Sequence, residues 1–359
     1  MNTIRCCSIT AAPFTTIINQ LLLLLPLGGG WEGAKKIAMR TLIILASFFI
    51  WTIGAKAAQL VLPQPDNNSK EVTIKSNGFD LFGTLHQPEA KKKLTVLLLI
   101  SGSGPTDRDG NQVQMMNNSL KFLADELAEK GIATLRYDKR GIAKSSVPGF
   151  SNADVIFEDY VTDAVNWINF LKTQTQFANI YVAGHSEGSL IGMLAAKRAG
   201  ADGFISLNGP GRPADEIILK QISRQGTPQE VIDQVKSMID KVKAVERFED
   251  VPPYLMALFQ PDIQPYLKSW FDYNPKVEIG KLTVPVLIIQ GENDIQVELE
   301  DAQLLKSGNE KAELKLIEGM NHILKDSAKD LQQNMATYTN PDLPLNPTIV
   351  NIISAFILN

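Results

Sequence analysis

The chain has 359 residues, of which 44% are hydrophobic and 21% charged. This composition supplies enough apolar sequence for a large core and excludes wholesale disorder. The formal net charge is −4 and no block of basic residues is present, so nothing in the sequence favours binding to nucleic acid.

Residues 1–57 have the pattern of a signal peptide preceded by an extension. The segment 39–57 starts with Met39-Arg40, continues with an uncharged apolar stretch over 41–54 and ends in Ala-Lys-Ala, a cleavage site. The apolar stretch is shorter than the about 20 residues of a membrane span, although an uncleaved anchor stays an alternative. We expect an exported mature chain with no membrane span, translated from either Met1 or Met39.

The two cysteines of the chain, Cys6 and Cys7, fall in the segment that is removed. The mature chain therefore has no thiol, no disulfide and no cysteine-based metal site. An exported chain without cysteines is typical of the bacterial periplasm or exterior.

Beyond the signal, apolar strands alternate with helices. Strands are predicted at 72–75, 81–86, 94–100, 133–137, 180–183, 203–207, 284–290 and 314–318. Helices are predicted at 117–130, 154–171, 190–198 and 349–358. The first two strands flank Asn77-Gly78 and form an antiparallel hairpin. The alternation then predicts an α/β fold, a mostly parallel sheet with helices on both faces.

Residues 212–280 interrupt this alternation. They are helical and amphipathic, and they are expected to form a cap over the strand ends. The predicted organisation is an extension and signal peptide at 1–57, a core at 58–211 and 281–359, and a cap at 212–280. Aromatic side chains of the cap either line an acyl pocket or pack between cap and sheet: Tyr254, Phe259, Tyr266, Trp270 and Phe271.

The segment Gly184-His-Ser-Glu-Gly188 follows a predicted strand and precedes a helix. Glycines at its two ends permit a sharp turn that holds the central Ser186 hydroxyl above the sheet. The start of the following helix favours negative charge that develops there. Ser186 is therefore the predicted nucleophile.

A serine nucleophile needs a general base, which is normally a histidine oriented by a carboxylate. The chain has three histidines. His86 falls in the N-terminal hairpin, away from the strand ends, and His185 is expected to point away from Ser186. His322 follows the last predicted strand and is the predicted base.

The orienting carboxylate is expected between the serine and the histidine in the chain. Asp294, after the next-to-last strand, is the first choice and Glu292 the second. The oxyanion of acyl transfer also needs donors. They are predicted to be the backbone N–H groups of Glu187 and of Ser103, with Gly104 as the alternative to Ser103.

Neither a metal nor a cofactor is predicted. No histidine pair has ligand spacing, and the glycine-rich loop 101–110 lacks the Lys-Ser/Thr of a phosphate cradle. Charged residues in the loops after two strands are expected to pair with one another and brace the site: Asp107, Arg108, Asp109, Asp138 and Arg140.

Over residues 72–358 the chain resembles the α/β-hydrolase superfamily. The resemblance is carried by Ser-Gly-Ser-Gly-Pro-Thr-Asp-Arg-Asp-Gly at 101–110, Tyr-Asp-Lys-Arg-Gly at 137–141, Gly-His-Ser-Glu-Gly at 184–188 and Ile-Gln-Gly-Glu-Asn-Asp at 289–294. Together these motifs look like those of secreted bacterial carboxylesterases of the serine-aminopeptidase-like branch.

The resemblance implies an α/β-hydrolase fold with an inserted cap and hydrolysis of short-chain esters without a cofactor. It implies Ser186, Asp294 and His322 as the catalytic triad. It also implies Ser103 and Glu187 as the oxyanion donors. Two positions depart from the family pattern, because Ser101 stands where many relatives carry histidine and Ala143 replaces a glycine.

The expected function is therefore an exported serine hydrolase that cleaves a small-molecule carboxylic ester through an acyl-enzyme. An aminopeptidase or thioesterase could use the same triad, and the acidic cap residues Glu246, Glu249 and Asp250 would suit a substrate amine. A non-catalytic binding protein of the same fold is the third possibility. The sequence leaves the oligomeric state open.

Overall fold

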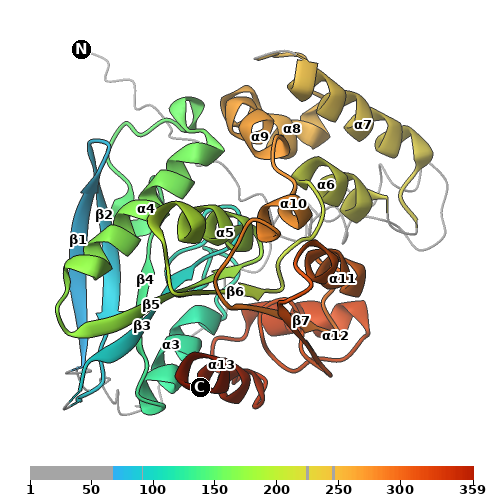
Figure 1. Ribbon diagram of the computed structural model, residues 1–359. Coiled ribbons are helices and arrows are strands. Elements are labelled where there is room, and N and C mark those ends of the chain that lie inside the picture. The colour runs from blue at the N-terminus through green and yellow to red at the C-terminus, as the bar shows by residue number, and fades with distance from the viewer. Residues whose placement is uncertain (1–67, 91, 224–225, 245–246) are drawn as a thin grey trace, which may run out of the picture.

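A computed structural model describes residues 68–359 apart from 91, 224–225 and 245–246, so the predicted signal segment lies outside the described residues. At its centre is an eight-stranded sheet in the order β1-β2-β4-β3-β5-β6-β7-β8 (Figure 1). The strands are β1 Ser69–Ser76, β2 Phe79–His86, β3 Leu94–Ile100, β4 Ala133–Tyr137, β5 Phe177–His185, β6 Gly203–Leu207, β7 Val286–Gly291 and β8 Glu313–Ile317. Pairing is antiparallel between β1, β2 and β4 and parallel elsewhere, which confirms the predicted mostly parallel sheet.

Local sequence determines where the β1–β2 hairpin turns and where α4 begins. The β1–β2 hairpin turns at Asn77-Gly78, where both residues have positive φ, 45° and 86°, as a two-residue turn between twisted strands requires. The helix predicted from residue 154 begins later, as α4 Phe157–Thr173. A 3-10 turn occupies Asn152–Asp154, and the Asp159 carboxylate then caps the helix by accepting the Ile156 N–H at 3.0 Å.

Helices cover both faces of the sheet (Figure 1). On one face lie α3 Ser119–Glu129 and α13 Ile349–Leu358, and on the other lie α4, α5 Glu187–Ala199 and α11 Leu299–Gly308. In β3 the side chains of Leu97 and Leu99 pack in the core under α3 and α13. Those of Leu98 and Ile100 pack in the core on the other face, under α4, α5 and α11. This burial on both faces explains the unbroken apolar run of the strand.

The strand order places β3 between β4 and β5. The connection from β3 to β4 runs toward one edge of the sheet, and the connection from β4 to β5 runs toward the other edge. The carboxyl ends of parallel strands at such a reversal border a crevice where ligands bind in open α/β sheets. The loop after β3 and the turn after β5 therefore lie side by side at the edge where chemistry is expected.

The segment 212–280 is helical, and its described residues contain no strand. It holds α6 Ala214–Ile222, α7 Gln229–Ala244, α8 Met256–Phe259, α9 Gln264–Phe271 and α10 Pro275–Ile279, with α6 to α9 grouped beyond one end of the sheet (Figure 1). It docks on α4: the Phe157 and Trp270 rings stack with centroids 6.0 Å apart, and the Phe157 N–H donates to Ser269 Oγ at 2.8 Å. The division of the chain at 57, 211 and 280 stays a prediction.

Between β8 and α13 the chain forms the short helix α12 Leu331–Ala336. Within residues 68–359, leaving out the five masked ones, no helix is both long and apolar enough to cross a membrane.

Candidate active site

Ser186 occupies a strained turn between β5 and α5. Its φ is 55° and its ψ −123°, a conformation that a residue with a side chain rarely adopts. A Cβ atom on Gly184 would lie 2.0 Å from the carbonyl oxygen of Gly188, and one on Gly188 would lie 2.5 Å from that of Ile100. Only glycine fits at both positions, so the turn that presents Ser186 depends on them.

His322 and Asp294 lie in the loops after β8 and β7 and are in direct contact. His322 Nδ1 is 2.7 Å from Asp294 Oδ2, and the two side chains are 4% and 1% exposed. The other carboxylate oxygen of Asp294 accepts the backbone N–H groups of Gln296 at 2.7 Å and Val297 at 2.9 Å. Asp294 is thus held in place, whereas the second choice, Glu292, is exposed to solvent.

Ser186 and His322 line the same small cavity. This histidine cavity has a volume of about 40 Å³, and its lining includes Gly102, Ser103, His185, Ser186, Gln296 and His322. The structure therefore brings the predicted nucleophile and the predicted base to one space, although 136 positions separate them in the chain. With Asp294 behind His322, the three side chains of the predicted triad gather at the carboxyl edge of the sheet.

The two predicted oxyanion donors border the same region. Glu187 is the first residue of α5, where backbone N–H groups have no partner within the helix. Ser103 lines every one of the three cavities around Ser186. The loop that carries it approaches the turn closely, because a Cβ atom on Gly102 would lie only 3.1 Å from Ser186 Cβ.

His185 does not point away from the site, and that prediction was wrong. Its ring lies beside the ring of His322, with centroids 4.8 Å apart, and its Nε2 is 2.7 Å from the carbonyl oxygen of His322. Since a carbonyl only accepts, Nε2 carries the proton and donates it. Burial, and then the neighbouring His322, lower the pKa of His185 to about 3, so this ring is neutral at physiological pH.

Asn208 is a residue of the site that the sequence reasoning missed. Its fully buried side chain donates to the carbonyl oxygens of Asn321 at 2.9 Å and His322 at 3.0 Å, and it accepts the N–H of Gly291 at 2.8 Å. It therefore joins the end of β7 to the histidine loop. The signal available in the sequence was an asparagine directly after a predicted strand, since asparagine tolerates the positive φ, here 49°, that this position adopts.

Comparisons with known proteins show which families and structures this chain is similar to. A family model described as "Serine aminopeptidase, S33" matches residues 116–256. Esterase EstD of Thermotoga maritima is 29% identical over 261 residues, which are 71% of this chain and 60% of the relative. The chain thus spans less than two thirds of the length of this curated relative.

Solved structures with similar folds include Est1E from Butyrivibrio proteoclasticus with bound ferulic acid. It has a TM-score of 0.53 and 20% identity, and the match covers 80% of this chain and 96% of Est1E. The alpha/beta hydrolase GrgF from a Penicillium species has a TM-score of 0.50 and 18% identity, with 71% and 91% covered. The chain has the α/β-hydrolase fold. The predicted resemblance to this superfamily is confirmed.

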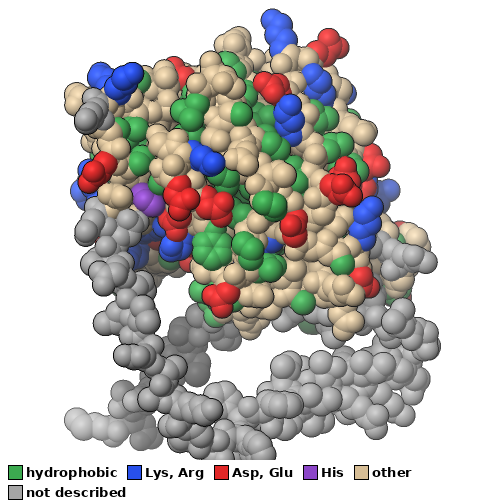
Figure 2. Space-filling view, turned by 90° about the horizontal axis from the view of Figure 1, so that it is seen from below, with side chains coloured by type: hydrophobic (Ala, Val, Ile, Leu, Met, Phe, Trp, Pro, Cys, Tyr) green, Lys and Arg blue, Asp and Glu red, His purple; other side chains and the backbone are tan. Residues whose placement is uncertain are grey.

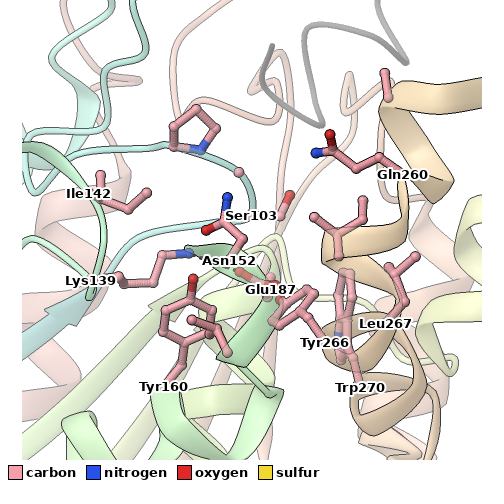
Figure 3. A pocket seen from close by; sticks show the side chains of 15 residues that line it. Ser103, Lys139, Ile142, Asn152, Tyr160, Glu187, Gln260, Tyr266, Leu267 and Trp270 are labelled. Atoms are coloured by element: carbon pink, nitrogen blue, oxygen red, sulfur yellow. Dashed lines mark hydrogen bonds and ion pairs between the residues drawn. The ribbon is translucent and has the colours of Figure 1, made fainter. Parts of the chain in front are cut away.

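Two further cavities lie beside the turn that carries Ser186 and Glu187. The apolar cavity, about 40 Å³, has Ser186, Leu190, Ile217, Ile218, Trp270 and Val297 in its lining. The outer cavity, about 140 Å³, has Lys139, Tyr160, Glu187, Tyr266, Leu267 and Trp270 in its lining. In Figure 3, Tyr266, Leu267 and Trp270 of α9 form one wall of the outer cavity and Lys139 and Tyr160 the opposite one.

The five aromatic residues of the predicted cap divide between the two expected roles. Tyr266 and Trp270 line cavities. Phe259 and Phe271 are buried in the hydrophobic core, and Tyr254 is 44% exposed. Packing and pocket lining are therefore both present, carried by different side chains.

The loop charges pair, though not always with the expected partners. Arg108 binds Asp138 at 2.6 Å, as predicted. Arg140 instead reaches α4 and binds Asp163, also at 2.6 Å. Asp107 accepts backbone N–H groups of its own loop. No group of three or more potential metal ligands occurs among the described residues.

Proposed function

We propose that this chain is a serine carboxylic-ester hydrolase that works through an acyl-enzyme. The observation that carries the proposal is the buried 2.7 Å contact between His322 Nδ1 and Asp294, with His322 sharing a cavity with the strained Ser186. The esterase name of the Thermotoga maritima relative and the serine aminopeptidase family match support the same chemistry.

In the proposed first half-reaction, Ser186 Oγ attacks the ester carbonyl while His322 Nε2 takes its proton. Asp294 holds the ring in the required tautomer and stabilises the imidazolium that forms. The Ser103 and Glu187 N–H groups, with the N-terminus of α5, stabilise the oxyanion. His322 then protonates the departing alkoxide as the carbon–oxygen bond breaks.

In the second half-reaction, water attacks the acyl-enzyme carbonyl and gives a proton to His322. The bond to Ser186 Oγ breaks, Ser186 recovers the proton and the carboxylic acid leaves. Side chains of this chain supply every proton transfer, so the proposed mechanism uses no cofactor.

The substrate is proposed to carry a short acyl group. The apolar cavity beside Ser186 has a volume of about 40 Å³. A water-sized group needs about 10–15 Å³ on this measure, so the cavity accepts about three such groups. We assign the acyl chain to this cavity and the alcohol part to the larger outer cavity, which lies between α9 on one side and α4 with the loops after β3 and β4 on the other.

An aminopeptidase would need a carboxylate to hold the substrate amine. Among the described residues that line the three cavities, Glu187 is the one acidic residue, and its partner is the Lys139 ammonium. Glu249 and Asp250 are exposed and line none of these cavities, and Glu246 lies outside the described residues. These features favour esters over substrates with a free amine.

The decisive experiment compares wild type with Ser186→Ala. A fluorophosphonate probe should label wild type and leave the variant unlabelled. Wild type should also cleave p-nitrophenyl esters, with kcat/KM highest for acyl chains of about two to four carbons, and should leave aminoacyl anilides intact. Failure of the folded wild type to react with the probe would favour a non-catalytic binding protein.

Export is the second part of the proposal and is supported by the signal pattern at 39–57. Full-length chain expressed in a bacterium should be recovered from the periplasm or the medium. N-terminal sequencing should find a mature chain that begins at Ala58. Recovery of uncleaved chain from the membrane fraction would indicate an anchor instead.

A further inference from the structure

A buried ion pair lies directly behind Ser186 and has no part in the proton transfers. Lys139 Nζ is 2.9 Å from Glu187 Oε2, and both side chains are 2% exposed. Lys139 follows β4, and Glu187 follows Ser186. Figure 3 shows the two side chains directed toward one another at the base of the outer cavity. The ring of Tyr160 lies 5.2 Å from Nζ and covers the ammonium.

The same ammonium also holds the backbone of the oxyanion loop. Lys139 Nζ donates to the carbonyl oxygen of Gly102 at 2.6 Å. That carbonyl and the N–H of Ser103 belong to one peptide unit, which is trans, as are all peptide bonds among the described residues. In a planar trans peptide the C=O and N–H point in opposite directions. Lys139, by holding the carbonyl, therefore sets the direction of the Ser103 N–H.

The Lys139–Glu187 pair is a poor source of folding stability. Glu187 Oε1 is also buried and has no hydrogen-bond partner among the described residues, so this carboxylate is incompletely satisfied. Removing two charges from water is costly, and apolar replacements of buried pairs are often as stable. Stability alone therefore explains the Lys139–Glu187 pair poorly.

We propose that Lys139 and Glu187 are positioning residues that aim both oxyanion donors, an inference that rests on the proposed ester hydrolysis. Lys139 orients the Ser103 N–H through the Gly102 carbonyl and polarises that peptide, which strengthens the N–H as a donor. The Glu187 side chain fixes Lys139, while the Glu187 backbone supplies the second donor. One ion pair thus connects the two donors, one from the loop after β3 and the other from the start of α5.

The test is Lys139→Met, with Arg108→Met as the matched control. Arg108 is also buried and joins the same two loops, but its guanidinium donates to Asp138 and not to Gly102. Loss of one oxyanion donor lowers kcat by about 100-fold or more. We expect a kcat loss of about that size in Lys139→Met with KM changed by less than about threefold. Arg108→Met also loosens these loops, so any loss of kcat in this control should be equal for an ester and its thiono analogue.

A thionoester substrate separates aiming of the oxyanion donors from general damage. Its carbonyl sulfur is a larger and weaker hydrogen-bond acceptor than oxygen, so it gains less from the donors. Lys139→Met should slow the ordinary ester about 100-fold and the matching thionoester less than about 10-fold. Equal slowing of both substrates, or a kcat near wild type, would overturn the inference.

Folding and the proposed function are controlled separately. The double variant Lys139→Met/Glu187→Gln leaves no unpaired buried charge, so it should fold even where the single variant does not, and it should show the same selective loss. Ser186→Ala should abolish turnover of both substrates. If wild type turns over neither ester, the proposed function fails; if it does and the double variant retains the wild-type preference for the ordinary ester, only the present inference fails.

Discussion

The burial of His185 predicts that this protein loses stability at mildly acidic pH. Burial, followed by the proximity of His322, lowers the pKa of His185 from 6.5 to about 3. Below pH 6.5 the unfolded chain therefore takes up a proton that the folded chain does not. Folding stability from this group is complete above pH 6.5 and is lost as pH falls toward 3. The difference of 6.5 minus 3, at about 1.4 kcal/mol per pH unit, amounts to about 5 kcal/mol.

His185→Gln removes this titration while keeping a side-chain N–H that can donate to the His322 carbonyl. Between pH 6.5 and 5 the free energy of unfolding of wild type should fall by about 2 kcal/mol more than that of the variant. Urea unfolding at pH 8, 7, 6 and 5 measures this difference directly. The pH 8 and 7 measurements are the control, because the difference between the two proteins should be constant there.

The reasoning is refuted if the two stability curves stay parallel from pH 7 to 5. Parallel curves would mean that His185 takes up its proton equally in the folded and unfolded chains, and hence that solvent reaches the ring in the folded state.

Three more predictions follow from the site. Asp294→Asn should lower kcat by about 10³-fold or more, since it loses the charge that orients His322, and Glu292→Gln should retain wild-type kcat; similar losses in both variants would contradict the pairing with Asp294. Gly188→Ala should lower the free energy of unfolding by about 2 kcal/mol or more, because its Cβ would meet a β3 carbonyl at 2.5 Å; a urea midpoint equal to wild type would show that the turn relaxes freely. Lys325 is fully buried, and burial lowers its pKa from 10.5 to about 8. As pH rises from 8 to 10.5 the unfolded chain loses a proton that the folded chain has already lost, so the free energy of unfolding of wild type should rise by about 3 kcal/mol relative to Lys325→Met. A constant difference between the two proteins in urea unfolding at pH 8 and 10.5 would exclude this.

Local sequence determined most of the framework. The strands Leu94–Ile100, Ala133–Tyr137 and Gly203–Leu207 have the predicted limits because each is a short run rich in aliphatic, aromatic or β-branched residues and is followed by a polar residue. Ser186 could be identified because its turn needs glycine at fixed neighbouring positions, a requirement visible within five residues. The helical character of 212–280 was equally local, since amphipathic periodicity alone indicates it.

Side-chain direction and partner choice needed the tertiary structure. The sequence allowed Asp294 or Glu292 beside His322, and only the bend after β7 brings Asp294 into contact while leaving Glu292 in solvent. The predicted direction of the His185 ring was wrong because that direction depends on a contact with the carbonyl oxygen of His322, 137 residues away in the chain.

The Lys139–Glu187 pair makes the same distinction. The sequence around Lys139 or Glu187 does not indicate that the two residues pair. They come into contact because β4 and β5 lie on either side of β3 in the sheet. Backbone conformation is set largely by neighbours in the chain, so strands, turns and the position of Ser186 could be predicted. Contacts between side chains are set by how strands are ordered and packed, so the partners of His185, Lys139 and Glu187 were decided by the tertiary structure alone.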